Sequence, residues 1–176
     1  MWYSGFVKNV SAHPVGWITL DETLGVLATL GGPEASITDN QLRYWDRQAI
    51  VPVRRAQQGT ALMYSTQDVA LVRVIARLLA ASVPPQQVTA ALRYLRASIC
   101  DAFRDKATRR AFYIDDRGIG HVVRVSEVPA DNRQSVDLRA CWDGVSRVMR
   151  AELQRRRHST VWNGVRHVKA KALVAA

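Results

Sequence analysis

Residues 38–64 have the sequence TDNQLRYWDRQAIVPVRRAQQGTALMY, and this stretch decides the fold class that the sequence predicts. It begins with Thr38 and Asp39, either of which can accept hydrogen bonds from the free N–H groups in the first turn of a helix. A helix is therefore predicted over 39–48. Pro52 ends it, because proline lacks the N–H that a helix interior needs.

A short basic hairpin follows this helix directly. Two strands, predicted at 51–53 and 62–64, are joined by a polar tip that includes Arg54, Arg55 and Gly59. In a winged helix the elements come in this order: the helix enters the major groove of DNA and the hairpin reaches the phosphates. The stretch predicts a mainly α-helical protein built around a winged helix-turn-helix, with a C-terminal β-hairpin and long helix.

Six side chains of this stretch are candidate DNA contacts. Guanidinium and amide groups can meet base edges or phosphates, and a phenol can meet a phosphate. The six residues are Gln41, Arg43, Tyr44, Arg47, Arg54 and Arg55. Trp45 falls on the opposite face of the helix and is predicted to lie in the core. The simpler alternative for the helical residues is a solvated face with Tyr44 half buried.

The composition favours a polyanionic partner. The chain has 176 residues, a formal net charge of +10 and a pI of about 10.4. Charge of this sign says little about the fold but much about partners, and nucleic acid is the first expectation. The hydrophobic fraction of 48% indicates a buried core. A merely soluble basic protein is the alternative.

Other kinds of site find little support. Cys100 and Cys141 lie far apart and form no CxxC pair, so neither a zinc site nor a disulfide framework is predicted, and a reducing cytoplasm fits. The histidines have no spacing that suggests a triad or a metal site; they are His13, His121, His158 and His167. No signal peptide, membrane span or phosphate-binding glycine loop is recognised. No enzyme, cofactor or metal is predicted.

Apolar residues at helical spacing predict further helices from Thr19, over 66–81 and from Pro84 towards Arg109. The stretch 111–125 then has the pattern of a β-hairpin, with Asp115 to Gly118 as its polar turn. The predicted division is a DNA-binding domain at 1–97, a dimerisation or partner module at 98–158, and a basic tail at 159–176.

A last helix is predicted over about 135–156, and it carries an apolar stripe. The stripe residues proposed to meet a second subunit are Leu138, Trp142, Val145, Met149 and Leu153. A helix with such a stripe must bury one side, so a two-fold homodimer is predicted. The alternative is that the helix packs against the rest of its own chain.

The motif LRYWDRQAIVP, residues 42–52, resembles the N-terminal DNA-binding domain of the MerR family. That family has Leu-Arg-Tyr, Tyr or Trp, Glu-Arg, then two or three residues before Leu-Pro. Tyr64 and Ser65, followed by Asp68, are also similar. The resemblance covers about 19–97 and implies that the predicted helix is a recognition helix, with Arg43 and Tyr44 on it.

Two departures from the family pattern stand out. The connection from Thr29 to Thr38 is longer than the compact turn of the family. The second strand of the hairpin lacks the Arg that the family often places before Tyr-Ser. The C-terminal hairpin and helix resemble no effector domain.

These observations predict a sequence-specific double-stranded DNA-binding transcriptional regulator of MerR-like type, cytoplasmic and nucleoid-associated, with no membrane partner. Two alternatives remain open. One is an architectural DNA-binding accessory factor of recombination or segregation, which would bend DNA with modest base preference. The other is a protein-interaction adaptor, whose C-terminal module binds another protein.

Overall fold

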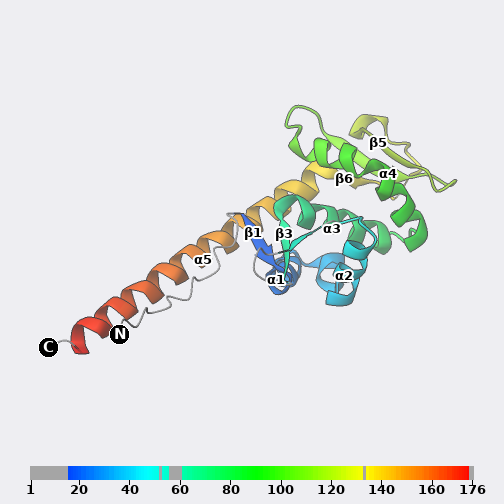
Figure 1. Ribbon diagram of the computed structural model, residues 1–176. Helices are drawn as coiled ribbons and strands as arrows, with labels where there is room; N and C mark the ends of the chain where they lie inside the picture. The colour runs from blue at the N-terminus through cyan, green and yellow to red at the C-terminus, as the bar shows by residue number, and fades with distance from the viewer. Residues whose placement is uncertain (1–15, 52, 56–60, 133, 175–176) are drawn as a thin grey trace.

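A computed structural model describes residues 16–51, 53–55, 61–132 and 134–174, with side chains described up to Arg156. The described part is mainly α-helical and contains five α-helices. They are α1 (Leu20–Leu30), α2 (Asp39–Arg47), α3 (Thr66–Ala80), α4 (Pro85–Arg104) and α5 (Leu138–Val174). Figure 1 shows the first four gathered into one body, from which the distal part of α5 projects as a single rod.

Two small antiparallel sheets complete the described part of the fold. The first has the order β1-β3-β2 and the second the order β5-β4-β6. Their strands are β1 (Trp17–Thr19), β2 (Arg54–Arg55), β3 (Leu62–Ser65), β4 (Arg110–Ile114), β5 (Gly120–Arg124) and β6 (Val136–Asp137). The predicted mainly α-helical class and the C-terminal hairpin with its long helix are both present.

Helices α1, α2 and α3 all begin with a capping box. In each, a Ser or Thr side chain accepts a hydrogen bond from the third helical residue, whose own side chain accepts one from the cap backbone. The pairs are Thr19 with Glu22, Thr38 with Gln41, and Ser65 with Asp68. Of the two candidates for the cap of the helix predicted at 39–48, Thr38 is the residue that caps it.

Several predicted boundaries were wrong. A strand was expected at 51–53, but β2 consists of Arg54 and Arg55. These are the residues that pair with β3, where Arg54 lies opposite Met63. The last helix does not end near 156 but continues to Val174. Strands β1 and β6 were not predicted. Each is only two or three residues long, so no alternation of polar and apolar residues could announce it.

The long connection between α1 and α2 folds into a 3-10 helix, η1 (Gly32–Ser36). Its Glu34 is only 1% exposed and lies 2.6 Å from Arg73 Nε and 3.0 Å from Arg77 Nε. A carboxylate can be buried at this depth because two guanidinium groups compensate its charge. The extra residues of this connection therefore place Glu34 in a buried ionic contact with α3.

One continuous core joins the N-terminal helices to α5. Helix α3 supplies much of it, and α5 packs against both α3 and α1. The stripe residues Leu138, Val145 and Met149 are no more than 1% exposed, while Trp142 stacks on Phe103 with ring centroids 5.7 Å apart. Leu153 packs on the same core. The stripe expected to face a second subunit is thus covered by the chain itself.

Candidate nucleic-acid interface

Helix α2 separates its apolar and polar side chains onto opposite faces. Leu42 and Trp45 are 1% and 5% exposed, so the prediction that Trp45 lies in the core is confirmed. On the other face the Arg43 side chain is 51% exposed, Tyr44 is 44% exposed, and Arg47 is exposed. A short helix with this polar face can present cations and a phenol to a groove without disturbing the core.

Two of the candidate residues on α2 already have partners. The Gln41 Oε1 atom accepts a hydrogen bond from the Thr38 N–H at 2.9 Å, so its carbonyl closes the cap of α2. Its amide N–H groups are the only part left to donate to a ligand. Arg43 Nε lies 2.6 Å from Asp39 Oδ1, one helical turn earlier. This contact is exposed and uses the Nε atom of the Arg43 guanidinium.

The β2–β3 hairpin carries the other two candidates. Arg54 and Arg55 make up β2 and both are exposed. Arg55 lies opposite Leu62 in the antiparallel ladder. The Arg54 guanidinium lies over the Trp17 ring of β1, 5.0 Å from its centroid, in a cation–π contact.

Helix α4 supports the C-terminal end of α2, which sequence reasoning missed. Arg93 Nη2 donates to Gln48 Oε1 at 2.6 Å, and Arg96 Nη1 donates to the Ala49 carbonyl at 3.5 Å. Ala49 has a φ of 55°, the left-handed region that side chains with a Cβ disfavour. The signal in the sequence was the spacing of Arg93 and Arg96, which places both on one face of α4.

A groove of about 510 Å³ lies beside the hairpin, between β1, the start of α3 and α4. Three arginines line it, Arg54 from β2 and Arg96 and Arg104 from α4, and Arg104 Nη2 donates to Gln67 Oε1 at 3.2 Å. Asp68 also lines the groove, and burial raises the pKa of its carboxyl above the usual value. The groove joins the basic hairpin to basic side chains of α4.

The two cysteines have protonated thiols at neutral pH. Burial raises the pKa of Cys141 to about 11, and it also raises the pKa of the half-buried Cys100. A thiol must lose its proton to bind a metal or attack an electrophile. Within the part of the chain whose side chains are described, no three His, Cys, Asp or Glu side chains are grouped as metal ligands would be.

Asp115 forms the turn that was predicted for it. Its Oδ1 accepts hydrogen bonds from the backbone N–H groups of Arg117 and Ile119, at 3.0 and 2.8 Å. His121 Nε2 lies 3.0 Å from Asp115 Oδ2 and, with these backbone donors, holds the pKa of Asp115 below its usual value. This pair closes the β4–β5 hairpin and lies apart from α2.

Residues 34–95 match the family model described as MerR HTH family regulatory protein. The match runs from η1 through α2, the β2–β3 hairpin and α3 into α4, and it confirms the resemblance for that segment. This segment is a MerR-type helix-turn-helix and indicates a DNA-binding regulator. A search of curated proteins found no match. Among the described residues, no helix is long and apolar enough to span a membrane.

Proposed function

We propose that the chain, which carries a MerR-type helix-turn-helix over residues 34–95, is a sequence-specific transcriptional regulator that binds double-stranded DNA as a winged helix. The observation that carries the proposal is the exposed basic face of α2 followed by the exposed arginines of β2. Helix α2 would enter the major groove, and Arg54 and Arg55 would bind phosphates on its flank.

The ion pair of Arg43 does not stand in the way of base contact. An exposed pair at this helical spacing stabilises a helix by only about 0.3–0.5 kcal/mol. A bidentate contact from Arg to guanine contributes about 1–3 kcal/mol of base discrimination. The exposed pair with Asp39 is therefore weak enough to exchange for a contact with a base.

We also propose that the regulator works as a homodimer. A two-fold pair of helix-turn-helix units covers two half-sites and gains affinity from both. Since the apolar stripe at Leu138, Val145 and Met149 lies in the core, the contact with a second copy falls to the projecting part of α5 (Figure 1). An isolated helix is only marginally stable in water, so a second copy packed along this part of α5 would stabilise it.

A protein-interaction adaptor is the second candidate function, and one observation favours it. Tyr94 of α4 is 86% exposed and Ile119 of the β4–β5 turn is 53% exposed. Both line a mainly apolar groove of about 350 Å³ between α4 and the hairpin. Exposed aromatic and apolar side chains beside one groove are a common feature of protein interfaces. The two functions are compatible, because this groove is formed by other residues than the candidate DNA contacts.

Selection of genomic DNA fragments with the purified full chain, followed by footprinting, tests the proposal. A sequence-specific dimer should protect an inverted repeat, with half-sites about one helical turn or a multiple of it apart. A matched variant with Arg43, Arg54 and Arg55 all changed to Ala should select nothing above background. Strong bending with modest base preference would support an architectural factor, and failure to bind any duplex at low salt would support the adaptor.

A further inference from the structure

We propose that Arg156 of α5 is a positioning residue for the β2–β3 hairpin: it fixes β1, and β1 in turn fixes Arg54. The proposal deepens the proposed function, because its consequence for DNA binding requires that the hairpin contact phosphates. It assigns to α5, far along the sequence, a role in the geometry of the DNA-binding surface. Three successive contacts carry it.

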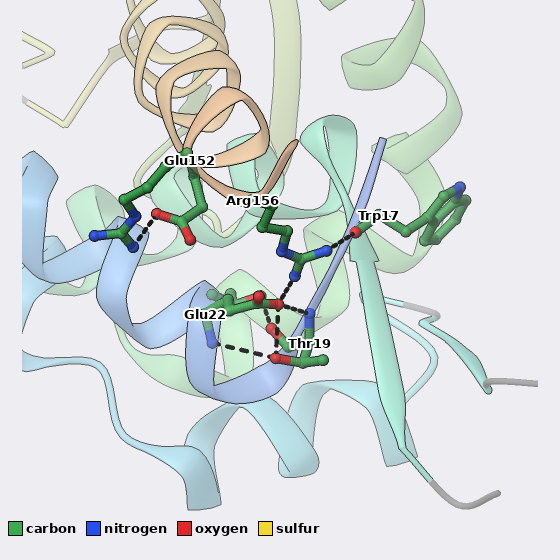
Figure 2. Close-up of polar contacts among 7 residues, drawn as sticks. Trp17, Thr19, Glu22, Glu152 and Arg156 are labelled. Carbon is green, nitrogen blue, oxygen red and sulfur yellow. Dashed lines mark hydrogen bonds and ion pairs between the residues drawn. The ribbon is translucent and has the colours of Figure 1, made fainter. Parts of the chain in front are cut away.

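The first contact joins α5 to β1 and α1. Arg156 Nη1 donates to the carbonyl oxygen of Trp17 at 3.0 Å, and the same guanidinium is ion-paired with Glu22. Figure 2 shows the Arg156 side chain reaching from α5 to the backbone of Trp17 and to Glu22 at once. Glu22 Oε2 also accepts hydrogen bonds from the N–H and hydroxyl of Thr19, at 2.7 and 2.8 Å. One guanidinium thus holds both the strand and the start of α1.

The second contact, strand pairing through β3, and the third, the Trp17 ring, both lead from β1 to Arg54. Strand β1 pairs with β3, with Trp17 opposite Ser65, and β3 pairs with β2, with Met63 opposite Arg54. The Trp17 ring also lies beneath the Arg54 guanidinium at 5.0 Å. Trp17 is therefore held by α5 through its carbonyl and contacts the DNA-binding cation through its ring.

Strand β2 needs this support because it is only two residues long. Within the described residues it has one neighbouring strand, β3, so few backbone hydrogen bonds fix it. Side-chain contacts that reach across β3 from β1 then help to fix where its arginines lie. The cation–π contact with Trp17 is such a contact, and it is only as well placed as β1 itself.

The neighbouring Arg155 provides a matched control. Its side chain is 77% exposed and pairs with Glu152, one helical turn away on the same helix. The Arg156 side chain is 24% exposed and Glu22 is 28% exposed, so their pair is more shielded from water. Replacing either arginine removes one positive charge from α5, but only Arg156→Ala removes the contact with β1.

Hydrogen exchange without DNA tests the positioning step by itself. In Arg156→Ala, backbone amides of β1 and β3 should exchange about fivefold faster or more, while amides of β4 and β5 keep their wild-type rates. Arg155→Ala should leave both sheets unchanged, and Arg156→Lys, which keeps the charge and a donor, should restore much of the protection. Unchanged exchange in β1 and β3 of Arg156→Ala would overturn the proposal whether or not the protein binds DNA.

A double-mutant cycle with duplex DNA tests the functional step. Arg156→Ala should weaken binding about threefold to tenfold and lower the slope of log affinity against log salt by about one, as if the Arg54 contact were lost. In an Arg54→Ala background the same change should have almost no further effect. Additive losses would mean that Arg156 binds DNA directly, and they would refute a positioning role.

Failure of this proposal can be told apart from failure of the proposed function. If the wild type binds no duplex, the regulator function is refuted, while the exchange experiment still decides the role of Arg156. If the wild type binds and Arg54→Ala weakens it but Arg156→Ala does not, the function stands and the positioning role is refuted.

Discussion

Helix α2 has an exposed polar face, whereas the described side chains of α5 supply a stripe of the core. The nine-residue α2 buries Leu42 and Trp45 and leaves exposed, among others, Arg43, Tyr44 and Arg47. The much longer α5 buries an apolar stripe in the core of the chain. An exposed cationic face contributes little to stability and is available for recognition, whereas an apolar stripe must be covered for the chain to fold. Substitutions should therefore affect binding on α2 and folding on α5.

The largest effect is expected on α5. Replacing Val145 and Met149 together with Glu places two charges in a core where both side chains are at most 1% exposed. Each buried, unpaired charge costs several kcal/mol, which together approach the whole free energy of unfolding. The double variant should lose its cooperative thermal transition, measured by circular dichroism.

The exposed Arg147 and Arg150 on the same helix provide the control for that experiment. Changing both to Glu should leave the thermal transition close to that of the wild type. A Val145→Glu, Met149→Glu protein that stays folded as a monomer, from a wild type that is a dimer, would place the stripe at a subunit interface instead.

The next effect separates the two faces of α2. Trp45→Ala should lower the free energy of unfolding by about 3–5 kcal/mol, because it empties an aromatic core position. Tyr44→Ala, one residue earlier on the exposed face, should change it by no more than about 0.5 kcal/mol. Denaturant titration measures both. Equal stability losses would show that the two faces of α2 are not divided as described.

A smaller effect concerns Arg43 on DNA. Arg43→Ala should weaken binding to the best site by about 1–3 kcal/mol and binding to random duplex far less, measured by fluorescence anisotropy. Asp39→Ala is the control, because it releases Arg43 without removing its charge and should leave affinity for the best site almost unchanged. Equal losses on both duplexes would make Arg43 a phosphate contact.

The smallest effect is at the end of α2. Ala49 has a φ of 55°, so Ala49→Gly should stabilise the protein by up to about 1 kcal/mol through relief of backbone strain. Ala97→Gly, at an exposed position within α4, should instead destabilise it by about 0.5–1 kcal/mol. Thermal melts that show both variants destabilised would mean that Ala49 is not strained.

Local features of the fold could be predicted from the sequence. Thr38 was a predicted cap, and it bonds to Gln41, three positions later. Trp45 was placed in the core because helical spacing sets it opposite Arg43. In both cases the interacting residues lie within one or two turns of the chain, where spacing alone fixes geometry.

Features that depend on distant residues could not be predicted. Glu34 is buried because Arg73, 39 residues later, lies beside it. Arg156 contacts Trp17 across 139 residues, and no local pattern marks either position as a partner of the other. For α5, periodicity indicated that one side must be covered but not by what, and a second subunit was predicted where the chain's own core covers the stripe.

The same division applies to the candidate site. Six residues were proposed from the sequence, and the four arginines and Tyr44 among them keep exposed or reachable side chains, while Gln41 closes the cap of α2. Residue type and spacing indicated which side chains could meet DNA. They gave no account of the supports from Trp17, Arg93 and Arg96, because these come from other elements of the fold.

The salt dependence of duplex binding tests the central claim most directly. Each phosphate contact contributes about 0.9 to the slope of log affinity against log salt, so Arg54→Ala with Arg55→Ala should reduce the slope by about two units. The variant should keep the wild-type thermal transition, since both side chains are exposed. Binding that weakens with this reduced slope supports the hairpin as a phosphate-contacting element of a DNA-binding regulator. An unchanged slope and affinity would contradict it.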